Sequence, residues 1–255
     1  SFTNYGLAEG LPHRNVTDII ETRSGEYLFA TQNGIVRLNV DRSEPSSPYF
    51  ETIEIEAPEE NTRVVSRLVE DRDGNIWAGT GGGLFRLTKA DGRWLTERQR
   101  TEIDSKPNSD IIGINTLLID RAGTLWVGSA FQGVFRRRGD GGFDRFTEKN
   151  GLSQNGISDI FQDSSDRIWV GTGAGLTLLV NDPKPGEKVS STVYREKDGL
   201  LTDFVETMFE SSDGRIWVGT RGGLNLFTDE RTISERPFVG YTPENGLQHV
   251  RITTI

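Results

Sequence analysis

Apolar and polar residues alternate along this chain in short runs, and one arrangement of such runs recurs. Its clearest copy, at residues 213–224, reads Asp-Gly-Arg-Ile-Trp-Val-Gly-Thr-Arg-Gly-Gly-Leu. Close copies contain Trp77, Trp126 and Trp169, and a more divergent first copy has Leu28 in the tryptophan position. Successive copies are 43 to 49 residues apart. A period of this length, with several short strands in each copy, predicts the blades of a β-propeller.

Each copy predicts four antiparallel strands. The first strand opens nine residues before the centre of a hairpin turn, at Val16, Val65, Ile114, Ile157 and Val205. The second strand carries the tryptophan, and the third begins at Ile35, Leu84, Val134, Leu176 and Leu224. The fourth strand is the least regular, with 143–146 and 192–194 as its clearest examples. Helical periodicity sustained over ten residues is absent from the sequence, so we predict an all-β fold.

The copies divide the chain into five complete repeats with partial ones at the two ends. The complete repeats cover approximately residues 10–50, 51–106, 107–151, 152–199 and 200–246. Residues 247–255 align with the first strand of a further blade, and Phe2–Tyr5 align with a fourth strand. We therefore expect a β-propeller domain or fragment whose natural protein continues past Ile255. Its open blade edges are expected to allow self-association.

The repeated tryptophans are predicted to be core residues. A four-stranded blade has two apolar faces, and stacking against neighbouring blades covers both. Burying one tryptophan removes ~150–250 Å² from water and contributes roughly 3–5 kcal/mol, as an upper estimate. We therefore expect packing between blades, and no aromatic ligand cage built from these residues.

The charge and residue composition of the chain limit the kinds of partner that it is expected to bind. The net charge of −9 and the isoelectric point near 4.9 argue against nucleic acid or an anionic membrane, because both attract basic surfaces. The chain has no cysteine, so thiol chemistry and disulfides are excluded. No apolar run is long enough to span a bilayer and no signal peptide opens the sequence. Contact with a membrane is expected only through parts of the parent protein outside this sequence.

Two stretches carry a family resemblance. Gly-Leu-Ser-Gln-Asn-Gly-Ile at 151–157 and Ile-Trp-Val-Gly-Thr at 168–172 resemble the two-component regulator propeller repeat. The first repeat departs from the pattern at Leu28 and at Gly34-Ile35. The resemblance implies a bacterial sensor ectodomain, periplasmic or extracellular, joined to a transmembrane helix and a cytoplasmic output module such as a histidine kinase. It also implies ligand sensing, with a glycan or another polar molecule as the ligand.

Catalytic residues are not evident. The only histidines, His13 and His249, occupy equivalent loop positions, and nothing supplies further metal ligands at a readable spacing. The stretch 71–75 contains two carboxylates, but its glycine comes fourth and belongs to a hairpin turn, unlike a calcium loop. We expect no catalytic residues, no metal and no cofactor. Two alternatives stay open: a polysaccharide lyase-like propeller enzyme and a protein–protein interaction scaffold.

Candidate ligand-binding residues lie in two sets of loops that share one face of a propeller. These loops join the fourth strand to the next first strand, and the second strand to the third. The candidates are Phe131, Gln132, Arg221, Arg63, Asn155, His13, Arg14, Asn15, Gln32, Asn33, His249 and Arg251.

Their expected ligand is an oligosaccharide or a peptide. We expect Phe131 to stack on it, while Arg221, Arg63 and Asn155 donate hydrogen bonds. The alternative for Phe131 is that its ring covers a neighbouring blade. The opposite face carries near-identical Asp-Gly turns and is expected to be scaffold.

Overall fold

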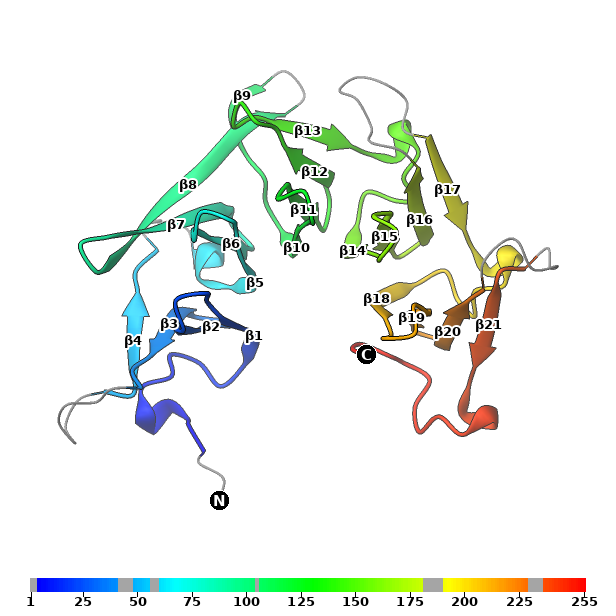
Figure 1. Ribbon diagram of the computed structural model, residues 1–255, viewed down its shortest axis with the longest axis horizontal. Helices are drawn as coiled ribbons and strands as arrows, with labels where there is room; N and C mark the ends of the chain where they lie inside the picture. The colour runs from blue at the N-terminus through cyan, green and yellow to red at the C-terminus, as the bar shows by residue number, and fades with distance from the viewer. Residues whose placement is uncertain (1–3, 41–47, 56–59, 104–105, 181–189, 229–235) are drawn as a thin grey trace. The chain divides into compact units, whose positions relative to one another are not determined.

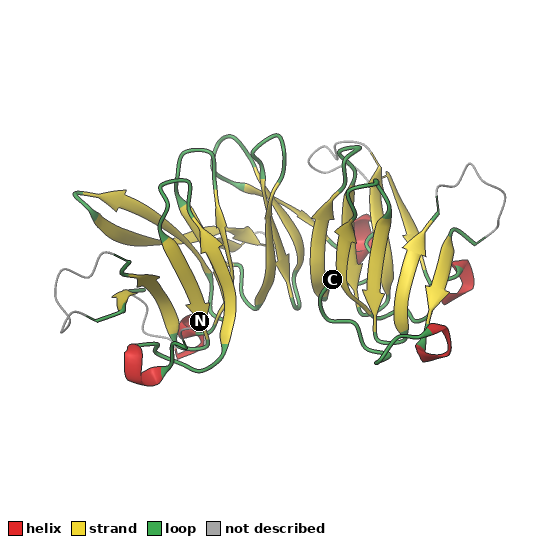
Figure 2. Ribbon diagram, turned by 60° about the horizontal axis from the view of Figure 1, so that its bottom comes forward, coloured by secondary structure: helices red, strands yellow, loops and turns green. Residues whose placement is uncertain are grey.

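The computed structural model describes residues 4–40, 48–55, 60–103, 106–180, 190–228 and 236–255 (Figure 1). The chain divides into two compact units, Ser1–Leu125 and Trp126–Ile255. Strands dominate both units, and the described helices are 3₁₀ turns of three or four residues (Figure 2). The predicted all-β propeller fold is confirmed. No helix among the described residues is long and apolar enough to cross a bilayer.

The first unit contains two antiparallel sheets in sequential order. The first sheet consists of β1 (Val16–Glu21), β2 (Tyr27–Thr31), β3 (Gly34–Leu38) and β4 (Phe50–Ile53). The second consists of β5 (Val65–Glu70), β6 (Ile76–Thr80), β7 (Leu84–Ala90), β8 (Arg93–Ile103) and β9 (Lys106–Asp110). Its fifth strand was not expected. It forms because β8 runs for 11 residues, and its last part pairs with β9 through Arg100 and Asp110.

The second unit contains two complete four-stranded sheets. One comprises β14 (Ile157–Gln162), β15 (Ile168–Thr172), β16 (Gly175–Val180) and β17 (Ser190–Tyr194). The other comprises β18 (Val205–Glu210), β19 (Ile216–Thr220), β20 (Gly223–Phe227) and β21 (Phe238–Tyr241). The unit boundary falls inside β11 of the remaining sheet, β10 (Ile114–Ile119), β11 (Leu125–Ser129), β12 (Gly133–Arg137) and β13 (Phe143–Phe146).

The five first strands begin at the residues that the sequence predicts, and the third strands begin within one residue of theirs.

A β-bulge near the start of the first strand turns one side chain toward the next sheet. The register of β1 shifts between Val16 and Asp18, and β5, β14 and β18 shift at the equivalent position. The bulged Thr17 donates its hydroxyl to the carbonyl of Val65 at 2.6 Å, and Ser158 donates to Val205 at 2.6 Å. The extra residue therefore supplies a hydrogen bond between sheets that a regular ladder does not offer.

Glycine after the tryptophan allows neighbouring sheets to approach closely. A Cβ atom on Gly171 would lie 2.8 Å from Cγ1 of Val205, the first residue of the next first strand. On Gly79 it would lie 2.5 Å from Cγ2 of Ile114. Both distances are shorter than carbon atoms tolerate, so the packing requires glycine at these two positions, whereas the first copy has the buried Ala30 in the same place.

The tryptophans on the second strands are buried, with one exception. Trp77, Trp126 and Trp169 are core residues, as predicted. Trp169 packs edge-on against Phe227 of the next sheet at a centroid distance of 5.0 Å. Trp217, on the last described sheet, is only partly buried.

The predicted partial strands at the two ends are not assigned as strands. Phe2 and Thr3 lie outside the described residues, and residues 250–255 have no hydrogen-bonded ladder partner in the described part of the chain. Ile252 nevertheless lies against Gly219 as Val205 lies against Gly171. A Cβ atom on Gly219 would be 2.9 Å from Cγ2 of Ile252, whose N–H donates to the carbonyl of Thr220 at 3.0 Å.

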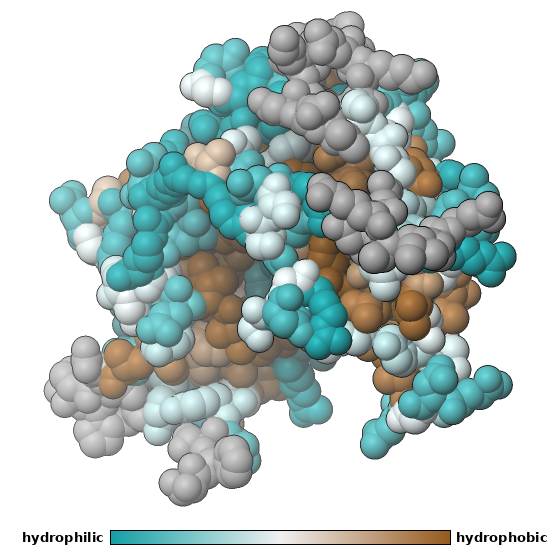
Figure 3. All heavy atoms as spheres, turned by 45° about the vertical axis from the view of Figure 1, so that its right-hand side comes forward, coloured by the Kyte–Doolittle hydropathy of each residue, from teal (hydrophilic) through white to brown (hydrophobic). Residues whose placement is uncertain are grey.

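Large apolar side chains are exposed on the first and the last described sheets. Ile19 of β1 and both Phe209 and Val239 of the last sheet are exposed. Figure 3 shows that hydrophobic areas lie among hydrophilic ones on the face that it draws. Self-association through such edges stays a prediction.

Substitution of Gly171 by alanine tests the packing requirement. We expect Gly171→Ala to lower the free energy of unfolding by about 1–3 kcal/mol, because the methyl group collides with the buried Val205. Gly139→Ala is the matched control, since a Cβ atom there has no heavy atom within 4 Å. Urea titration of both variants gives the comparison. Equal stabilities of the two variants would show that the sheets have room to separate.

Candidate functional site

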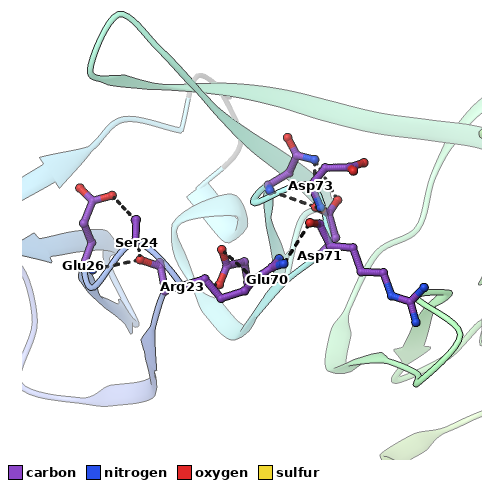
Figure 4. Close-up of polar contacts among 9 residues, drawn as sticks. Arg23, Ser24, Glu26, Glu70, Asp71 and Asp73 are labelled. Atoms are coloured by element: carbon purple, nitrogen blue, oxygen red, sulfur yellow. Dashed lines mark hydrogen bonds and ion pairs between the residues drawn. The ribbon is translucent and has the colours of Figure 1, made fainter.

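The hairpin turns between first and second strands are tied from one sheet to the next. Glu70 accepts a hydrogen bond from the backbone N–H of Arg23 at 2.8 Å, and the Arg23 guanidinium donates to the carbonyl of Arg72 at 2.9 Å (Figure 4). In the second unit Glu210 accepts from the backbone N–H of Ser164 at 2.7 Å. These side chains already serve the fold, which supports the interpretation of this face as scaffold.

A carboxylate at the start of the turn joins the turn to the tryptophan. Asp71 accepts hydrogen bonds from the backbone N–H groups of Asp73 and Asn75, both at 3.0 Å, and from the Trp77 indole at 2.8 Å. Asp163 binds the indole of Trp169 in the same way, at 2.8 Å. The described residues contain no group of three or more histidine, cysteine, aspartate or glutamate side chains that could hold a metal ion.

The opposite ends of the second strands carry tight loops closed by a hydroxyl. Thr80 donates to the carbonyl of Gly83 at 2.8 Å, and Thr220 donates to that of Gly223 at 2.9 Å. In the longer third loop, the hydroxyl of Ser129 accepts from the N–H of Phe131 at 3.2 Å. The hydroxyl therefore fixes the loop ends, and the residues between them are free to differ.

The loops before the first strands contain the 3₁₀ turns. These turns are η1 (Leu7–Glu9), η2 (Glu60–Arg63), η3 (Glu148–Asn150), η4 (Glu196–Asp198) and η5 (Pro243–Asn245). After η3, Asn155 closes the loop: its side-chain oxygen accepts from the N–H of Glu148 at 3.0 Å. Its carbonyl accepts from the N–H of Gly133 at 3.0 Å and so links it to the loop of Phe131. The side-chain oxygen of Asn155 is therefore occupied by the fold.

Two rim positions face each other across the tight loops of the first, second and fifth copies. The residue before the first strand accepts a backbone hydrogen bond from the first loop residue, as between Val64 and Gly81 at 3.0 Å. In the first copy the pair is Asn15 and Gln32, whose side chains are hydrogen-bonded at 3.1 Å.

In the fifth copy the facing pair is Phe204 and Arg221. The N–H of Arg221 donates to the carbonyl of Phe204 at 3.2 Å. The Arg221 guanidinium carbon lies 3.4 Å from the centroid of the Phe204 ring, a cation–π contact.

Glu206 joins this pair to Arg251. Its Oε1 accepts from Nε of Arg221 at 2.8 Å and from Nε of Arg251 at 3.0 Å. The Glu206 side chain is 14% exposed, against 48% for Arg221 and 57% for Arg251. We call Phe204, Glu206, Arg221 and Arg251 the arginine rim cluster.

The two arginines keep Glu206 ionised. Burial alone raises the pKa of this carboxyl, but the hydrogen bonds and charges of Arg221 and Arg251 outweigh burial and hold the pKa below its usual value. The cluster therefore carries one net positive charge at neutral pH.

Phe131 is the most exposed large aromatic side chain of the described residues, at 74%. Such exposure is what a ring available for ligand contact would show, and both interpretations of Phe131 stay predictions. The carbonyl of the next residue, Gln132, accepts from Nε of Arg145 at 2.7 Å.

The remaining candidates have local contacts or exposed side chains. Nδ1 of His13 accepts from the N–H of Asn15 at 3.0 Å, and Asn33 donates to the carbonyl of Pro12 at 3.3 Å. The side chains that are simply exposed are Arg14, Arg63 and His249.

The structure brings the candidates together only within each unit. Asn15 and Gln32 meet in the first unit, and Arg221 and Arg251 meet in the second. Arg63 and Phe131 belong to different units, so the single binding site that would combine them stays a prediction.

Phe204 and Glu206 were not among the residues predicted from the sequence. A signal existed for both, because the positions equivalent to Glu206 hold Thr17, Ser66 and Ser158 in other copies. Phe204 aligns with Gly156 one copy earlier.

Four four-stranded antiparallel sheets and one with a fifth strand, each built from one copy of the repeat, are typical of a β-propeller repeat protein. Residues 59–82, 151–174 and 199–222 match the two component regulator propeller family. The chain therefore contains the repeats of this family, as the sequence indicates. No sequence among the curated proteins matches the chain.

Solved structures share the fold. The extracellular domain of a putative hybrid two component system from B. thetaiotaomicron superposes with a TM-score of 0.72 at 21% identity, over 94% of this chain and 30% of that one. PorZ, a surface component of the type-IX secretion system of Porphyromonas gingivalis, gives 0.64 at 16% identity, over 94% and 36%. Virginiamycin B lyase from Staphylococcus aureus gives 0.63 at 12% identity, over 93% and 73%.

At these identities the likeness shows the fold alone. The chain spans about a third of the two component system domain and of PorZ.

The pKa of the Asp71 carboxylate leads to a prediction about how the stability of the fold depends on pH. Burial raises its pKa, but hydrogen bonds from Asn75 and Trp77 outweigh burial and lower the pKa below its usual value. A lowered pKa stabilises the folded state above the unfolded pKa of about 4, and this contribution is lost as the pH falls through the folded value.

We therefore expect Asp71→Asn to be less stable than the unaltered chain at pH 7, with the difference shrinking below a pH of about 4. Urea unfolding of both proteins at pH 7 and at a pH below about 4 measures the difference in stability. A difference that is the same at both would mean that the charge of Asp71 is not what stabilises the turn.

Proposed function

We propose that this chain is a non-catalytic ligand-sensing propeller of a bacterial two-component-type signalling protein. Its proposed ligand is a polar molecule, an oligosaccharide. The ligand binds to the loop face, which is formed by the loops between second and third strands and the loops before the first strands. The sensing part lies outside the cytoplasm, in the periplasm or the extracellular space. We also propose that the propeller is joined, in the full signalling protein, to an output domain.

The observation that supports ligand binding is the contrast between the two ends of the strands. At the turn end, side chains such as Glu70, Asp71 and Asp163 are bonded within and between sheets. At the loop end, the tight loops are closed by buried hydroxyls, and their remaining positions differ from copy to copy. A rigid framework that carries variable loops is the usual arrangement of a binding surface.

The family and the likeness to an extracellular domain of a two component system support the signalling role. The fold is also used by a lyase, so an enzyme remains the alternative that an activity test must address. A protein–protein scaffold is the other alternative. The absence of an evident acid–base pair in the sequence favours the binding role over the lyase role.

Substitutions at the loop face provide the test. With a ligand identified on a glycan array using the full ectodomain, Phe131→Ala and Arg221→Ala should each weaken binding about tenfold, or about 1.4 kcal/mol. The first removes an exposed stacking surface, and the second removes a charged donor. Isothermal titration calorimetry gives the affinities.

Arg215→Ala is the matched control. Arg215 is an exposed arginine in the same unit that pairs with Asp213, but it lies at the turn end of β19. Its substitution should leave the affinity unchanged. The proposal fails if this change abolishes binding while the loop changes do nothing. Turnover of the bound glycan would favour the lyase alternative, and capture of a protein partner without glycan binding would favour the scaffold.

A further inference from the structure

The arginine rim cluster places a positive charge on a chain that is acidic overall. The chain has a net charge of −9, whereas the cluster sets two guanidinium groups against one carboxylate. Both arginines bind the same carboxylate oxygen of Glu206, so the pairing leaves one positive charge over. About half of each arginine side chain remains exposed to solvent. A local charge of this sign attracts anions.

The guanidinium of Arg221 is oriented before any ligand binds. The guanidinium carbon of Arg221 lies 3.4 Å from the centroid of the Phe204 ring, and Nε of Arg221 donates to Oε1 of Glu206 at 2.8 Å. These two contacts restrain the orientation of the guanidinium. Within the described part of the chain Arg221 makes no other side-chain hydrogen bond, so the donors on its terminal nitrogens are available. A planar oxyanion can accept two of them at once, and little side-chain freedom is lost on binding.

The fold itself does not require a glutamate at position 206. In earlier copies a hydroxyl at this position bonds the carbonyl of the next first strand, as Thr17 bonds Val65 and Ser158 bonds Val205. An ionised Glu206 has no proton to donate in this way. It accepts from the side chain of Arg251, which precedes Ile252, the residue that packs against Gly219. The exchange of a hydroxyl for a carboxylate therefore serves to hold the two arginines.

We infer that the arginine rim cluster binds the carboxylate of an acidic sugar, a uronate, within the ligand of this propeller. This inference rests on the proposed function and narrows its ligand to anionic oligosaccharides. A carboxylate matches the planar fork of a guanidinium and forms charge-assisted hydrogen bonds with it. Phe131 in the same unit offers an exposed ring for the apolar face of a sugar.

Calorimetric titration of the full chain tests the inference with matched pairs of sugars. The probes are uronate-containing di- to tetrasaccharides, each paired with its carboxyl-reduced neutral counterpart. We expect a uronate to bind, and its neutral counterpart to bind about tenfold more weakly, because the reduced sugar lacks the charged acceptor. The affinity for the uronate should decrease as the salt concentration rises.

Arginine substitutions locate the carboxylate. Arg221→Gln and Arg251→Gln should each weaken uronate binding about tenfold and leave the weak binding of the neutral counterpart unchanged. Arg215→Gln is the control, because Arg215 also pairs with a carboxylate and lies over an aromatic ring, that of Trp217, at 6.0 Å. It should bind the uronate as the unaltered chain does. If Arg221→Gln fails to fold, Arg251→Gln carries the test alone, since Arg251 lies outside the described strands, after β21.

The outcomes separate this inference from the proposed function. Equal affinity for a uronate and its neutral counterpart, with both weakened by Phe131→Ala, overturns the inference and leaves the proposed function standing. Uronate binding that survives both arginine substitutions also overturns the inference. Binding of an acidic peptide, with no binding of any oligosaccharide, assigns the arginines to another class of ligand and overturns it too. If no probe binds, the oligosaccharide proposal and the inference fall together.

Discussion

The fold depends on close contact between neighbouring sheets, which a glycine near the end of the second strand permits in several copies. Gly79 and Gly171 each lie too near an apolar residue of the following first strand to carry a Cβ atom, and Gly219 lies similarly near Ile252. Beside Gly79 and Gly171 a bulged hydroxyl reaches the neighbouring backbone, as Ser66 bonds Ile114 and Ser158 bonds Val205. The preceding Trp169 packs into the core between its sheet and the next. Close packing and hydrogen bonding therefore reinforce each other at the same point, as interiors packed to high density require.

The two ends of the strands differ in how their side chains are bonded. At the turn end, residues of neighbouring sheets come within hydrogen-bonding distance, and Glu70 and Glu210 link one hairpin to the next. A change there disturbs two sheets. At the loop end, Thr80 and its equivalents close each loop with bonds inside a single sheet. A change at the tip of such a loop costs the framework little, so side chains such as Phe131 and Arg221 can be placed there.

The arginine rim cluster shows how a structural position acquires chemistry in a repeat. The bulge already directs the side chain of residue 206 toward the next strand, since the same bulge directs Thr17 and Ser158. With a carboxylate at that point, the interaction changes from a hydroxyl–carbonyl bond to two ion pairs. Phe204 then stacks on the Arg221 guanidinium, a contact that a residue without an aromatic ring, such as the equivalent Gly156, cannot make.

The sequence by itself determined the strands and most of the core of this protein. The starts of the first strands, the hairpin turns and the burial of Trp77, Trp126 and Trp169 depend on short local patterns that the chain repeats. The candidate loops were also predictable, because loop residues that differ between copies are visible in an alignment of the repeats. Only the tertiary structure decided which of these residues meet. Glu206 and Arg251 are 45 residues apart and touch because Ile252 packs against Gly219. The extra strand β9 was likewise decided by its pairing with the end of β8, which no local pattern encodes.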